Sequence, residues 1–161
     1  MPLTRIAFFD KIFLTKTYLI GENTMSQFNE LMQQCVNMEY NDLVSMARSS
    51  FEQLYPICQE VDKANNGAFL ATSIVLSAIA ADNKLSEKEV CFLRDVLELD
   101  AKAIATFLSL YDSRMAELVD QFADSLSVDN KSNVLALVTA VAACDETISK
   151  EETAFIHKLL I

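Results

Sequence analysis

Residues 73–97 read SIVLSAIAADNKLSEKEVCFLRDVL, and residues 136–160 read ALVTAVAACDETISKEETAFIHKLL. The two stretches align when the chain is shifted by 63 residues, from residue 73 to residue 136. Each copy has an apolar segment, a turn that starts with aspartate, and an amphipathic helix opened by Ser-x-x-Glu. The pattern predicts an internal duplication of a helical hairpin, with the two copies packed together. The coinciding positions include Ala80/Ala143, Asp82/Asp145, Ser86/Ser149, Glu89/Glu152, Phe92/Phe155 and Leu97/Leu160.

The rest of the chain also spaces its apolar residues as helices do. Glycine and proline number only 2 each, which disfavours turn-rich β folds and glycine-built phosphate loops. Pro56 lies inside one expected helix, so we expect a kink or a break near Tyr55. At 161 residues the sequence predicts one compact all-α domain of about seven to nine helices. The expected helices are Thr4–Ile20, Gln27–Asn37 (capped by Ser26), Asn41–Lys63, Ala68–Ala81, Ser86–Leu97, Asp100–Tyr111, Asp112–Ser125, Ser132–Cys144 and Ser149–Ile161.

The N-terminal helix carries more apolar side chains than one helical face can bury, among them Phe8, Phe9 and Phe13. Either this helix packs centrally, or its surplus forms a dimer or partner surface. Met25 follows directly on a break at residues 21–24, and a second translation start there would make the preceding helix optional. We therefore divide the chain into an N-terminal helix over 1–24, an optional extension, and an all-helical domain over 25–161.

The charge balance restricts the partners that the protein can have. Lys and Arg total 13 against 23 Asp and Glu, a net charge of −10. This negative net charge repels the phosphates of nucleic acid and favours the binding of cations or of a basic protein surface. The longest apolar runs, Ala68–Ala81 and Val134–Cys144, are shorter than the roughly 20 residues of a membrane-spanning helix. We expect a cytoplasmic protein without membrane insertion.

Both copies of the repeat contain a capping box, at Ser86–Glu89 and at Ser149–Glu152. Capping, at about 1 kcal/mol for each cap, explains the serines and glutamates. It does not explain Asp82 and Asp145, because an aspartate at a helix C-terminus opposes the helix dipole. One explanation is a tight turn in which the aspartate accepts hydrogen bonds from backbone amides beyond it.

The other explanation is a cation site formed by Asp82, Glu89, Asp145 and Glu152. Calcium and magnesium bind carboxylate oxygens, and zinc is a third candidate. Neither copy is an EF-hand, because the central glycine and the glutamate at the twelfth position are missing. The cation hypothesis requires the two acidic turns to face a common place.

The Ala-Ala-Asp and Ala-Cys-Asp turns, each followed by Ser-x-x-Glu, and Phe8–Lys11 near the start resemble the bacterial TerB-like tellurite-resistance family. The resemblance covers about residues 68–161. It implies an all-helical, internally duplicated domain that binds divalent metal through the four carboxylates. It also implies a role in tellurite and general stress response, within protein assemblies near the membrane. The family's glycine after each aspartate is replaced here by Asn83 and Glu146, and glutamate tolerates a left-handed backbone poorly.

Residues suited to catalysis are few. His157 follows Glu152 by five residues, which is not the i, i+4 spacing of a helical metal pair, and we expect it to be a partly exposed surface residue. Cys144 adjoins Asp145, whose charge disfavours the thiolate. All four cysteines lack metal or disulfide spacing and are expected to be small buried side chains.

These features favour a non-enzymatic protein. The leading hypothesis is a metal-binding stress-response module. The alternative is a metal-independent adaptor that uses the acidic surface or the N-terminal helix to bind protein partners, with a homodimer as one such assembly. A hydrolase with paired carboxylates ranks last.

Overall fold

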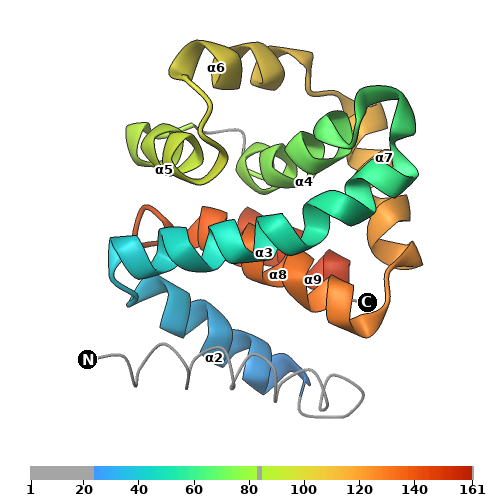
Figure 1. Cartoon of the computed structure of the whole chain (residues 1–161). Helices are drawn as coiled ribbons and strands as arrows, with labels where there is room; N and C mark the ends of the chain where they lie inside the picture. Colours follow the sequence, from blue (N-terminus) through green and yellow to red (C-terminus); the bar gives the residue numbers. More distant parts are fainter. Residues whose placement is uncertain (1–23, 83–84, 161) are drawn as a thin grey trace.

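A computed structural model of the chain describes residues 24–82 and 85–160 (Figure 1). Within these residues it contains eight α-helices, one short 3-10 helix and no strand, which confirms the predicted all-α class. The expected helix Thr4–Ile20 lies outside the described residues. The helices are α2 (Thr24–Val36), α3 (Tyr40–Val61), η1 (Lys63–Asn65), α4 (Ala68–Ala80), α5 (Glu87–Leu97), α6 (Ala101–Leu110), α7 (Ser113–Ser125), α8 (Val128–Ala143) and α9 (Lys150–Leu160).

The core is built around α4 and α8. Ten consecutive residues of α4, Leu70–Ile79, are buried, and so is the stretch from Val134 to Cys144 in and after α8. A helix that is apolar on all sides must be covered on all sides. Helix α3 packs along α8, and α4 contacts both helices. Figure 1 shows α3 crossing the middle of the molecule, with α2 on one side and α4, α5 and α6 on the other.

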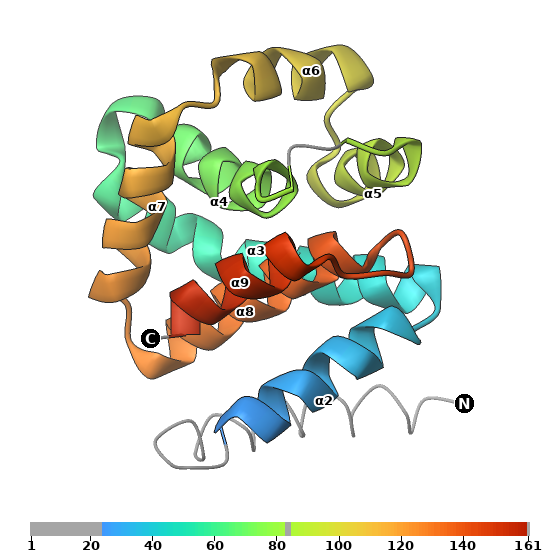
Figure 2. The same cartoon turned by 180° about the vertical axis from the view of Figure 1, so that it is seen from behind.

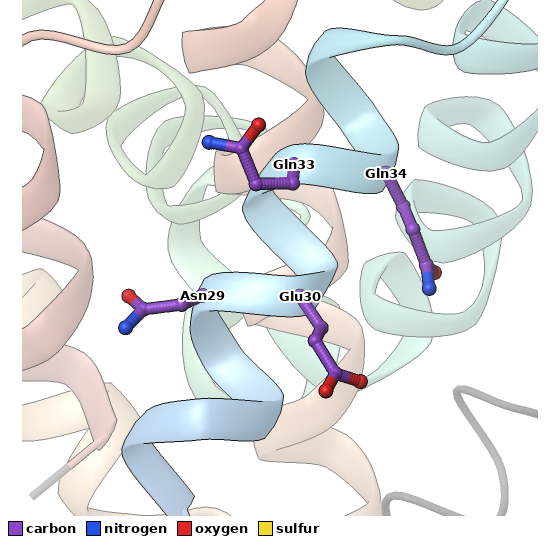
Figure 3. Close-up of a pocket in the computed structure, with 4 residues that line it drawn as sticks. All are labelled: Asn29, Glu30, Gln33 and Gln34. Carbon is purple, nitrogen blue, oxygen red and sulfur yellow. The ribbon is translucent and has the colours of Figure 1, made fainter.

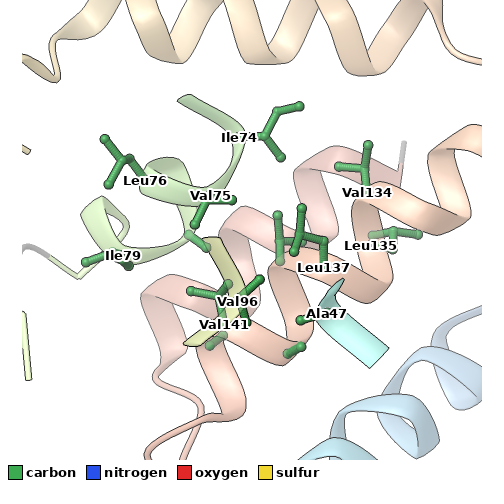
Figure 4. Close-up of a cluster of buried hydrophobic side chains, with 14 of the residues drawn as sticks. Ala47, Ile74, Val75, Leu76, Ile79, Val96, Val134, Leu135, Leu137 and Val141 are labelled. Atoms are coloured by element: carbon green, nitrogen blue, oxygen red, sulfur yellow. The ribbon is translucent and has the colours of Figure 1, made fainter. Parts of the chain in front are cut away.

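Figure 4 shows aliphatic side chains of α4 and α8 meeting in this core, together with side chains from α3 and α5. Burial of α4 covers Leu70–Ile79, whereas Phe69 in its first turn is 39% exposed. No described helix is long and apolar enough to cross a bilayer. The labelled core residues are Ala47, Ile74, Val75, Leu76, Ile79, Val96, Val134, Leu135, Leu137 and Val141.

Two helices begin three or four residues earlier than predicted. Helix α2 starts at Thr24, so Ser26, the predicted cap, lies inside its first turn and not before it. Helix α8 starts at Val128, four residues before the predicted Ser132, because the Ser127 hydroxyl accepts a hydrogen bond from the Asn130 amide at 3.3 Å. An N-cap placed there extends the helix through a polar first turn that carries no apolar periodicity.

Pro56 does not break α3, which runs without interruption from Tyr40 to Val61. Of the kink or break expected near Tyr55, the break is absent, because α3 is continuous there. Leu54 and Cys58 on either side of the proline are both buried, with 1% and 0% of their surface exposed. Tertiary packing of these two turns offsets the hydrogen bond that proline cannot donate.

The connection between α3 and α4 depends on Gly67, which directly precedes α4. Its φ is +76°, in the left-handed region. A Cβ at this position would lie 2.6 Å from the backbone nitrogen of Gln59 and 2.8 Å from the carbonyl carbon of Cys58. Because both atoms belong to the backbone of α3, they cannot move aside as a side chain could. Glycine therefore lets α4 approach the end of α3 closely.

We predict that Gly67→Ala destabilises the fold by about 2 kcal/mol or more, through left-handed strain and this backbone clash. Urea unfolding followed by circular dichroism measures the loss. Asn66→Gly is the control, because Asn66 also has a positive φ, of 51°, which glycine accommodates. Its stability should change by no more than about 0.5 kcal/mol. Equal stability of Gly67→Ala and wild type would contradict this role of Gly67.

Candidate functional site

The four predicted carboxylates lie in two turns, one between α4 and α5 and one between α8 and α9. Helix α4 contacts both α8 and α9, and α5 contacts α8. Figure 2 shows the α8–α9 connection next to α5. Nζ of Lys88, in the first turn of α5, lies 3.5 Å from Oε2 of Glu146 in the other turn. The two acidic turns are therefore neighbours, although 63 residues separate them in the sequence.

Both predicted capping boxes are present with the same geometry. The amides of Ser86 and Ser149 each donate to Oε2 of the glutamate three residues later, at 2.7 Å. The amides of Glu89 and Glu152 each donate to the hydroxyl oxygen of the capping serine, at 3.1 Å. Both glutamates have only 4% of their surface exposed. Each carboxylate therefore caps the start of a helix while it is almost inaccessible to solvent.

The pKa values of Glu89 and Glu152 are affected by carboxylates of both turns. Burial raises the pKa of Glu89, the capping hydrogen bonds oppose this, and the charges of Asp145 and Asp82 raise it further. Burial likewise raises the pKa of Glu152 against its capping bonds, and the charges of Asp82 and Glu89 add to the increase. Each buried glutamate thus interacts with the aspartate of the opposite hairpin. This coupling agrees with the sequence-based expectation that the two turns face a common place.

Asp145 adopts the tight turn that was the simpler of the two explanations. Its Oδ1 accepts hydrogen bonds from both the amide and the hydroxyl of Thr147, each at 3.2 Å. Among residues 24–82 and 85–160, no group of three or more His, Cys, Asp or Glu side chains has a geometry that could hold a metal ion. The carboxylates are near one another, but they are not arranged as a closed ligand shell. The assignment of metal ligands stays a prediction.

Glu146 occupies the position at which the TerB-like pattern has glycine, and its φ is +72°. The second turn thus takes the left-handed conformation at a residue that is strained there. Sequence analysis identified this mismatch but not the ion pair between Glu146 and Lys88. The only signal for that pair was a lysine inside the Ser-Glu-Lys-Glu capping box.

The thiol of Cys144 borders the second turn and is 6% exposed. Burial raises its pKa, and the charges of Glu89, Asp145 and Glu152 raise it further. A thiol in this environment stays protonated and is a poor nucleophile. The predicted packing role of Cys144 is consistent with this burial.

Cys35 and Cys58 are also buried, but Cys91 is exposed. The prediction that all four cysteines are buried is therefore wrong for Cys91. Helix α5 directs Phe92 and Leu93 into the core, and this orientation places Cys91 on the outer face.

His157 is half-buried, as predicted. Its ring centroid lies 4.7 Å from that of Phe28, so it helps to pack α9 against α2. Its Nε2 atom is buried, and no residue in the described part of the chain forms a hydrogen bond with it. This contact gives His157 a packing role.

No family model, curated protein or solved structure matches this chain. The likeness to the TerB-like family therefore depends on the sequence motifs of the two turns.

We predict that Glu89→Gln stabilises the protein at pH 7.5, by about 0.5–2 kcal/mol as for other single stabilising substitutions. Glutamine can still complete a capping box, but it removes a charge that burial and neighbouring carboxylates disfavour. A carboxyl group whose pKa is raised on folding makes the native state less stable as pH rises through that pKa. The advantage of the variant should therefore shrink as the pH falls to about 4, near the ordinary pKa of glutamate. Urea unfolding at both pH values measures this difference.

Glu87→Gln is the matched control, because Glu87 is exposed in the same first helical turn. The negative charge of Glu87 interacts favourably with the positive, N-terminal end of the helix dipole. Its removal should therefore lower stability slightly, by about 0.3–1 kcal/mol. If Glu89→Gln is less stable than Glu87→Gln at pH 7.5, repulsion among the four carboxylates does not destabilise the folded protein.

We also predict that Glu146→Gly is more stable than Glu146→Ala by about 1 kcal/mol, because only glycine relieves the left-handed strain. Both substitutions remove the ion pair with Lys88, which is exposed and contributes little. Thermal unfolding of the two variants isolates the backbone effect. Equal midpoints would show that the turn is not strained at this residue.

Proposed function

We propose that this chain is a non-enzymatic, TerB-like module that binds a divalent cation between its two acidic turns. The supporting observation is that Glu89 and Glu152 are buried, and that each interacts with carboxylates from the opposite hairpin. A cation at this place would offset the repulsion among four carboxylates that the fold holds together.

The chemistry of the donor set favours calcium or magnesium over zinc. All four side chains offer carboxylate oxygens, the ligands that hard cations prefer, whereas zinc in proteins is bound mainly by cysteine and histidine. Cys144 is the nearby thiol, and its environment opposes the deprotonation that zinc binding needs. Because the carboxylates do not enclose an ion in the described geometry, we infer that the turns adjust or retain water when a cation binds.

A binding role agrees better with these side chains than catalysis does. The capping hydrogen bonds hold Glu89 and Glu152 against the helix starts, and Asp145 is engaged in its own turn. Cys144 is a poor nucleophile, and His157 packs on Phe28. The role in tellurite and general stress response, within a larger protein assembly, is proposed from the sequence resemblance alone.

Isothermal titration calorimetry tests the proposal with calcium, magnesium, manganese and zinc added separately to the metal-free protein. We expect binding heat from calcium or magnesium. In the Asp82→Asn/Asp145→Asn double variant this heat should be lost, because two of the four charges are removed while the side chains keep their size.

The Glu87→Gln/Glu151→Gln double variant is the matched control. It removes the same number of charges from exposed positions beside the two turns and should bind as wild type does. Circular dichroism verifies that both variants are folded. If both double variants lose the binding heat equally, the ions respond only to the net charge of the protein and not to a site at the two turns.

Absence of heat from all four ions in the wild-type protein would refute the cation proposal. The metal-independent adaptor, which binds protein partners through the acidic surface or the N-terminal helix, would then be the leading hypothesis.

A further inference from the structure

We draw no further inference here: the strongest candidate, the open pocket beside α2 lined by Asn29, Glu30, Gln33 and Gln34 (Figure 3), is formed by the polar face of a single helix, and nothing among the described residues shows what covers it.

Discussion

The fold depends on the burial of α4 and of the apolar C-terminal part of α8, from Val134 onward. Helices α4 and α8 can be shielded from water only by each other and by a surrounding layer of amphipathic helices. Their contact leaves little freedom in how the two hairpins are placed. Helix α3 completes the layer, and Gly67 lets its end approach the start of α4. The acidic turns follow directly from α4 and α8, so the packing that buries the apolar helices also determines where the carboxylates lie.

Local hydrogen bonding and long-range electrostatics act in opposite directions at these turns. A glutamate at the third position of a helix is favoured by the capping bond and by the helix dipole. Two such glutamates, both buried and each close to aspartates of the other hairpin, disfavour each other's charge. The capping bonds are local and persist wherever the hairpins pack. The repulsion between Glu89 and Asp145, and between Glu152 and Asp82, exists only because the two hairpins meet.

Sequence reasoning succeeded where structure is local. The two capping boxes and the buried α4 were predictable because a few adjacent residues determine each of them. It failed where distant packing decides the outcome, as at Cys91, which the packing of α5 leaves exposed. At Pro56 it left a kink or a break open, and α3 continues through this residue. The ion pair between Lys88 and Glu146 could not be found from a single sequence, because it depends on the distance between two hairpins.

The difference between local hydrogen bonding and long-range packing also bears on the role of the four carboxylates. A capping box accepts glutamine as well as glutamate, and an aspartate turn can be formed by asparagine. Helix initiation and turn geometry therefore require none of the four negative charges, although they do require oxygen acceptors at these positions. A cluster that served folding alone could be neutral and would lack the repulsion that, in addition to burial, raises the pKa of both glutamates. The charge itself is what a cation would use, and for this reason we place the proposed function at these turns.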